Sequence, residues 1–313
     1  MSRTRMTRAQ MTRAQMSMLP DGRRLHLHDG PIDLIVEAWG ERSEVEAAYR
    51  DAWTRFVTVL DELCAELPLL RRACREESPW PRSVVARRMM AAVRPYAAEY
   101  FITPMAAVAG AVAEEILAAM VSTAELSRAY VNDGGDIALH LCAEQQFVVG
   151  VVDLPDMRLA NLPSLLGTTT LNAADAVRGI ATSGWRGRSF SLGIADAVTV
   201  LADRAAAADA AATIIANAVD LPGHSGIVRV RACELAPDSD LGARMVTQHV
   251  AELSDGEIDE ALETGARTAE RLLRMGLIRS AALSLQGETR VIGKLGKSTA
   301  IADLTHERGL VHA

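Results

Sequence analysis

Hydrophobic positions recur along this chain with two periods, one typical of strands and one of helices. Alternating or continuous apolar runs rich in β-formers predict strands. These strands cover residues 31–39, 128–141, 146–154, 179–184, 195–202, 225–232 and 244–250, with a hairpin over 278–293. Apolar residues three and four apart predict helices. The helices cover residues 43–67, 83–95, 105–127, 209–219 and 254–276.

The order and ends of these elements indicate the fold class. Strands and helices are mixed without a regular βαβ rhythm, which favours an α+β fold. Ser43 and Glu46 have the spacing of a capping box at a helix start. Gly276 is placed to end the helix over 254–276. The segments 128–141 and 146–154 are expected to pair across a turn.

Composition indicates a well-cored protein that does not bind nucleic acid in general. Of 313 residues, 49% are hydrophobic and 4% aromatic, so the core must be mostly aliphatic. The net charge of −7 argues against a general affinity for nucleic acid. The longest apolar stretch, 104–120, contains Glu114 and Glu115 and predicts a buried helix and no membrane span.

Cysteine usage and the N-terminal sequence bear on location. No spacing among the cysteines indicates a zinc site or disulfide framework, so we expect reduced thiols in a cytoplasmic protein. They are Cys64, Cys74, Cys142 and Cys233. Residues 1–22 contain a repeated MTRAQ but no apolar core like that of a signal peptide. We expect a disordered tail over 1–22 and one domain over 23–313.

The stretch "AAAADAAATIIANAV" (205–219) carries one carboxylate, Asp209, and one hydroxyl, Thr213. Four residues apart on a helix, both side chains lie on one face. One interpretation is structural: Asp209 is the N-cap of its own helix, and Thr213 bonds to a carbonyl one turn earlier. The other is a site for a hard divalent cation such as Mg²⁺, which prefers oxygen ligands.

Two further stretches carry candidate ligand-binding groups. In "VNDGGDIALHL", the Gly134–Gly135 pair predicts either a hairpin turn or a close approach of the backbone to a ligand, flanked by Asn132, Asp133 and Asp136. In "GIATSGWRGRSF", small donors at 182–184 precede Arg186 and Arg188. Arginine binds phosphate through two parallel hydrogen bonds, although a solvated loop explains the same pattern.

Taken in order, "TPMAAVAGAVAEEIL", "VNDGGDIALHL", "GIATSG", "AVTVLA" and "ADAAAT" resemble the ApbE family of flavin transferases, over roughly residues 26–286. The resemblance implies an α+β fold of two T-fold-like halves packed as one compact unit. It also implies binding of FAD and Mg²⁺, with transfer of the FMN moiety to a Thr or Ser hydroxyl of a target protein.

The resemblance assigns roles to individual residues. Asp209 and Thr213 would be side-chain ligands of the metal, and a main-chain carbonyl near Val108 a third ligand. Other matched residues would lie along the flavin nucleotide as cofactor-binding residues. They are Asn132, Gly134, Gly135, Asp136, Thr182, Ser183 and Gly184.

Three departures from the family pattern leave the activity open. Ala109 replaces a lysine, Glu114 replaces an aspartate, and "SFSLGIADA" (189–197) replaces the usual "HIIDPxTG". One hypothesis is a cytoplasmic Mg²⁺-dependent FMN transferase serving a redox partner. A second is an accessory protein that binds a flavin nucleotide or another phosphorylated ligand without transfer, in sulfur assimilation with ferredoxin-like partners. A third is hydrolysis of FAD by water. No membrane partner is expected, and the oligomeric state stays open.

Overall fold

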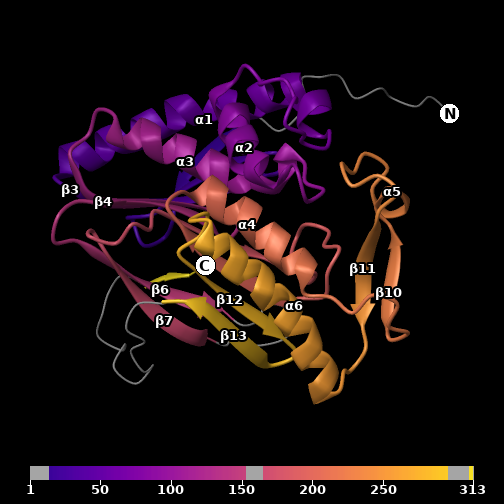
Figure 1. Cartoon of the computed structure of the whole chain (residues 1–313). Coiled ribbons are helices and arrows are strands. Elements are labelled where there is room, and N and C mark those ends of the chain that lie inside the picture. The colour runs from indigo at the N-terminus through magenta and orange to yellow at the C-terminus, as the bar shows by residue number, and fades with distance from the viewer. Residues whose placement is uncertain (1–13, 153–164, 295–309, 313) are drawn as a thin grey trace.

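The computed structural model describes residues 14–152, 165–294 and 310–312, and its central feature is a nine-stranded sheet (Figure 1). The order in space is β1-β2-β3-β4-β5-β8-β9-β12-β13, and every neighbouring pair is antiparallel. The strands are β1 Gln15–Met18, β2 Leu25–Asp29, β3 Ile32–Gly40, β4 Leu126–Asp133, β5 Asp136–Leu141, β8 Gly179–Ser183, β9 Ala197–Ala202, β12 Ser280–Leu285 and β13 Glu288–Gly293.

The sheet consists of two halves of the same topology. In the first half, β2 and β3 are followed by helices and then by β4 and β5. In the second, β8 and β9 are followed by helices and then by β12 and β13. The halves join where Ile137 and Ala138 of β5 pair with Ile180 and Gly179 of β8. The α+β fold with two T-fold-like halves in one compact unit is therefore confirmed.

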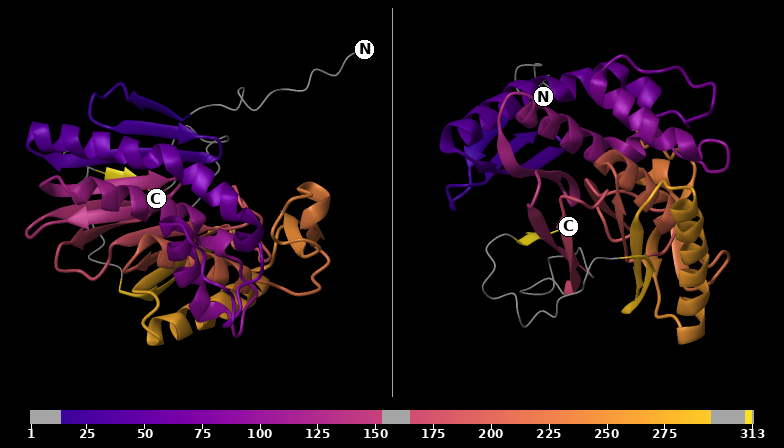
Figure 2. Two further views of the ribbon diagram at one scale, coloured as in Figure 1. Left: turned by 90° about the horizontal axis from the view of Figure 1, so that it is seen from above. Right: turned by 60° about the vertical axis from the view of Figure 1, so that its left-hand side comes forward.

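The main helices cover one face of the sheet, and a small sheet covers part of the other (Figure 2). The helices are α1 Arg42–Leu70, α2 Val84–Val93, α3 Val108–Val121, α4 Ala205–Ala218, α5 Ala232–Leu235 and α6 Asp255–Arg274. A three-stranded sheet, β14-β6-β7, is formed by β6 Gln146–Val152, β7 Leu165–Asn172 and β14 Leu310–His312. The expected pairing of 146–154 with 128–141 is therefore wrong: β4 pairs with β5, and β6 pairs with β7 and β14.

Side chains that point alternately to the two faces of the sheet form two hydrophobic cores, one against the helices and one against β6 and β7. In β8, Ala181 packs against the helices, while Ile180 joins the cluster beneath β6 and β7. In β9, Val200 and Leu201 divide between the two cores in the same way. Because successive strand side chains point to opposite faces, a strand covered on both sides reads as a continuous apolar run.

The starts of α1 and α6 differ in their caps. The capping box at Ser43 and Glu46 is not formed, because α1 begins at Arg42 with Glu41 as an N-cap that makes no side-chain hydrogen bond. A capping box is present at α6, where Ser254 and Glu257 bond to each other's backbone N–H groups. The predicted capped helix over 254–276 is thus confirmed.

Two parts of the fold lie at its margins. The pair β10 Ile227–Arg231 and β11 Met245–Val250, with α5, stands apart from the main sheet (Figure 1). Gln15–Met18 of the expected tail form β1 at an edge of the main sheet, so this part of the tail is ordered. The rest of that expectation, residues 1–13, lies outside the described residues.

One segment of the described residues, Pro104–Val121, is apolar and long enough to cross a membrane by length and composition alone. It comprises the short 3-10 helix Pro104–Ala107 and α3. More than half of it, 56%, is buried inside the protein, where α3 packs against α1, α4 and the sheet. The expectation of a buried core helix agrees with this packing.

Candidate functional site

The first turns of α3 and α4 lie against each other, and each helix caps the other. Asp209 of α4 accepts a hydrogen bond from the Gly110 N–H of α3 at 3.0 Å. Glu114 of α3 accepts one from the Ala206 N–H of α4 at 2.8 Å. The first N–H groups of a helix have no partner within it, so each carboxylate satisfies a donor of its neighbour. Two positive helix ends therefore meet at one place.

Glycine permits this approach. A Cβ added to Gly110 would lie 2.4 Å from the carbonyl oxygen of Ala205, and one at Gly179 would lie 2.0 Å from the carbonyl carbon of Arg204. Both distances are too short for any side chain, so α3, β8 and the start of α4 can pack this closely only through glycine.

Asp209 is not the N-cap of its own helix, which corrects one interpretation of the sequence. The helix α4 begins at Ala205 with Arg204 as N-cap, four residues before the predicted start. The alanines at 205–208 extend it, because alanine has the highest helix propensity. Burial raises the pKa of Asp209 to about 7, against hydrogen bonds from the Gly110 and Ala109 N–H groups that lower it.

Two more aspartates lie close enough to Asp209 for their charges to interact. Burial raises the pKa of Asp136 well above its usual range, and the charges of Asp209 and Asp133 raise it further. Burial also raises the pKa of Asp133 to about 7. The three residues form what we call the acidic cluster. Concentrated negative charge of this kind is unfavourable unless it is protonated or compensated by a cation.

The glycine pair forms the hairpin turn between β4 and β5. Gly134 and Gly135 have φ values of +63° and +113°, and the left-handed region that both occupy favours glycine. The Gly135 N–H donates to the Asn132 side chain at 2.8 Å. The predicted hairpin turn is thus confirmed, and the Gly135 N–H is bonded within the protein.

The end of β8 lies beside this turn. The Thr182 N–H donates to Asp136 Oδ1 at 3.2 Å, and the Thr182 hydroxyl bonds to the Thr199 hydroxyl at 2.8 Å. By strand alternation, Ser183 follows Ala181 onto the helix side of the sheet, while Thr182 faces the other side. Gly184 is buried against the Asp196 carbonyl. The structure therefore brings the segments 132–136 and 182–184 together, with their side chains divided between two faces.

Thr213 lies one helical turn after Asp209 and is partly exposed. Its hydroxyl does not bond to the carbonyl one turn earlier, as the structural interpretation required. Thr54, Thr264 and Thr268 all make that bond in their helices. Within the described residues, the Thr213 hydroxyl has no hydrogen-bonding partner in the protein and is available to a ligand.

The residues of the acidic cluster supply oxygen atoms only, and Mg²⁺ prefers such ligands. Among the residues that the structure describes, no three or more His, Cys, Asp or Glu side chains are grouped so as to hold a metal ion. A metal bound here would therefore take few protein ligands, namely Asp209, the Thr213 hydroxyl and main-chain oxygen. Mg²⁺ usually completes such a shell with water and phosphate oxygens.

The two arginines after the β8 turn have different surroundings. Arg186 Nε donates to Asp196 at 2.6 Å. The Trp185 indole N–H and the Gln286 N–H also donate to this carboxylate, which is 3% exposed. Arg188 instead lies over the glycine turn, with Nη1 3.4 Å from the position that a Cβ of Gly134 would occupy. Its side chain is exposed.

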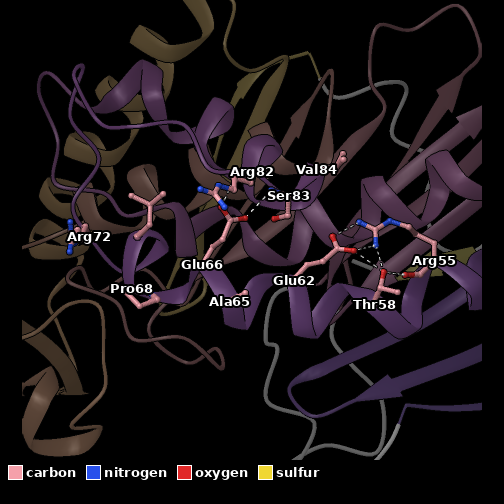
Figure 3. Close-up of a pocket in the computed structure, with 11 residues that line it drawn as sticks. Arg55, Thr58, Glu62, Ala65, Glu66, Pro68, Arg72, Arg82, Ser83 and Val84 are labelled. Carbon is pink, nitrogen blue, oxygen red and sulfur yellow. Dashed lines mark hydrogen bonds and ion pairs between the residues drawn. The ribbon is translucent and has the colours of Figure 1, made fainter.

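A groove of about 1030 Å³ lies elsewhere, along α1 and the start of α2 (Figure 3). Both of its glutamates have partners within the protein: Glu62 pairs with Arg55 at 2.8 Å, and Glu66 accepts hydrogen bonds from the backbone N–H groups of Arg82 and Ser83. None of the predicted site residues lines it. The groove and the candidate site are therefore separate.

Sequence reasoning gave no role to Glu114 or Asp196. Glu114 caps α4 and receives Arg88, while Asp196 fixes the loop that carries Trp185 and Arg186. The only signal in the sequence for Asp196 is its place beside the apolar run of β9, where an unpaired charge is costly.

Comparison with models of protein families shows to which family the chain belongs. A family model described as "AbpE bacteria" matches residues 16–291, which is most of the chain. The chain belongs to this ApbE-like family.

Curated proteins similar to the chain are UPF0280 proteins of archaea. The chain is 39% identical to one from Methanopyrus kandleri over 155 residues, 49% of this chain and 56% of that protein. It is 38% identical to one from Methanococcoides burtonii over 127 residues, 40% of this chain and 49% of that protein. The matches thus span about half the length of these relatives. A solved structure, the ApbE protein of Thermotoga maritima, gives a TM-score of 0.33 at 14% identity, covering 66% of this chain and 54% of that one.

Proposed function

We propose that this protein binds FAD with Mg²⁺ at the meeting point of α3 and α4 and transfers the FMN moiety to a cytoplasmic redox partner protein. The observation that carries the proposal is the acidic cluster beside two helix N-termini. A cation would stabilise the ionised carboxylates of Asp209 and Asp136, while the helix N-termini favour an anionic group such as a phosphate. A metal-bound pyrophosphate supplies both charges.

The residues of the chain fit these roles. Asp209 and Thr213, with a main-chain carbonyl near Val108, would hold Mg²⁺. The bound ion would neutralise negative charge on the pyrophosphate. The segments 132–136 and 182–184 would lie along the nucleotide. Asp209 accepts hydrogen bonds from the Gly110 and Ala109 N–H groups, and since the two oxygens of a carboxylate offer about four lone pairs, it can still bind a metal. Thr213 adds a neutral oxygen that needs no deprotonation.

A second function, binding of a flavin nucleotide without transfer, is favoured by the segment 189–197. Two of its polar residues are engaged in the fold: Ser191 bonds to Asn217 at 3.2 Å, and Asp196 is buried with three donors. Neither is available to position a substrate hydroxyl or to exchange a proton with it. This accessory role would serve a ferredoxin-like partner, as in sulfur assimilation.

One assay separates these functions. Purified protein is incubated with FAD and Mg²⁺, with and without a candidate flavin acceptor protein, and AMP and FMN are measured. AMP with a fluorescent acceptor and no free FMN supports transfer. Bound FAD without AMP supports the accessory role, and AMP with free FMN supports hydrolysis. Absence of FAD binding contradicts the proposal altogether. Asp209→Ala should abolish any activity that depends on the metal.

A further inference from the structure

We propose that Arg188 binds a phosphate of the flavin nucleotide and makes this site selective for phosphorylated ligands. The inference rests on the proposed function, since it assigns a residue of this chain to one chemical group of that ligand. It concerns recognition and leaves open whether FMN is transferred.

The two arginines of the loop differ in what their guanidinium groups already hold. Arg186 pairs with the buried Asp196 at 2.6 Å and also lies over the Trp185 ring. Arg188 makes no hydrogen bond or ion pair with another group among the described residues, and its side chain is exposed. Its N–H donors are therefore available to a ligand, and a guanidinium matches the geometry of a phosphate through two parallel hydrogen bonds.

The place of Arg188 connects it to the acidic cluster. Its guanidinium lies over Gly134, and its charge acts on Asp133, whose pKa it lowers against the effect of burial. Asp136, on the other side of the same two-residue turn, interacts with Asp209. A phosphate near these carboxylates is repelled, and Arg188 supplies positive charge at the point where the repulsion has to be overcome.

The glycine turn thus has a different role from the one expected of it. The Gly135 N–H is held by Asn132, so the turn offers the ligand fewer backbone donors than its sequence suggests. What Gly134 provides is a low surface on which the guanidinium rests, with Arg188 Nη1 3.4 Å from the nearest point that a side chain there would occupy. Recognition of the anion then falls to the arginine.

Three ligands separate the phosphate from the flavin. FAD carries both, riboflavin only the flavin, and ADP only the phosphates. Their affinities are measured by calorimetry with Mg²⁺ for the wild type, Arg188→Gln and Arg188→Lys. Arg274→Gln removes an equal charge from a side chain that is 70% exposed on α6, and is the matched control. We expect Arg188→Gln to weaken FAD and ADP at least about tenfold, to spare riboflavin, and to be partly rescued by lysine.

The outcomes distinguish this inference from the proposed function. If the wild type binds FAD and Arg188→Gln binds it equally well, the inference is refuted and the proposed function stands. If the wild type binds ADP but no flavin, the proposed function fails, and loss of ADP binding in Arg188→Gln still supports the phosphate role. Absence of binding to all three ligands contradicts both. If Arg274→Gln weakens FAD and ADP binding as much as Arg188→Gln does, the effect is one of overall charge and the inference is refuted.

Discussion

Replacement of Asp209 by asparagine tests whether the acidic cluster is strained by its own charge. The amide keeps an oxygen for the Gly110 N–H, which Asp209 now receives at 3.0 Å, so the cap on α3 is retained. Only the negative charge is removed. The variant therefore separates the electrostatic role of the side chain from its structural role.

The sign and size of the effect follow from the pKa. In the folded protein the pKa of Asp209 is about 7, above its ordinary value of 3.8. Between these values the unfolded chain releases its proton first, so the contribution of Asp209 to stability falls as pH rises from about 4 to about 7. The full difference is worth about 4 kcal/mol at most, and solvent contact of the partly exposed residue reduces it.

Urea unfolding at pH 5 and pH 8, without divalent cations, measures this effect. We expect Asp209→Asn to unfold with a higher free energy than the wild type at pH 8, and to exceed the wild type by clearly less at pH 5. Asp259→Asn, at a side chain 71% exposed, is the control and should change little. A gain of equal size at both pH values, or a loss at pH 8, would refute the electrostatic reasoning. Added Mg²⁺ should stabilise the wild type at pH 8 and not Asp209→Asn.

Three other substitutions test single contacts. Asp196→Ala should lower the free energy of unfolding by about 3 kcal/mol or more, measured in urea, because it leaves the Arg186 guanidinium and two N–H donors without their partner; a loss under 1 kcal/mol would contradict this. Thr213→Val should leave the melting temperature without Mg²⁺ unchanged but reduce the stabilisation by Mg²⁺, whereas Thr264→Val, whose hydroxyl bonds within α6, should not affect the response to Mg²⁺. Gly179→Ala should cost about 3 kcal/mol or more, since its Cβ would meet the backbone of Arg204 at 2.0 Å, whereas Gly256→Ala, with open space around it, should be neutral or slightly stabilising; tolerance of both would contradict the close packing.

Much of the fold follows from local patterns in the sequence. Strand and helix periods predict most elements, among them the helix over 254–276 that forms α6. The pairing of β6 was predicted wrongly because an apolar run shows that a strand is buried but not which strand lies beside it. The neighbours of β6 are β7 and β14, and β14 comes from the far end of the chain.

The candidate site was predictable only in part for the same reason. Spacing places Asp209 and Thr213 on one helix face, but the partner of Asp209 is Gly110, 99 residues earlier in the chain. Spacing also gives Arg186 and Arg188 equal weight. The structure separates them, because buried Asp196 binds the first and the second lies over the glycine turn. Such distinctions depend on contacts between segments that are distant in sequence.

Calorimetric titration of the purified protein with FAD, with and without Mg²⁺, in the wild type and in Asp209→Asn, tests the central claim most directly. That claim is that the meeting point of α3 and α4 holds a dinucleotide through a cation on Asp209. It predicts FAD binding to the wild type that is at least about tenfold tighter with Mg²⁺, and no effect of Mg²⁺ in Asp209→Asn. Equal FAD affinity with and without Mg²⁺, or an unchanged Mg²⁺ effect in Asp209→Asn, would contradict it.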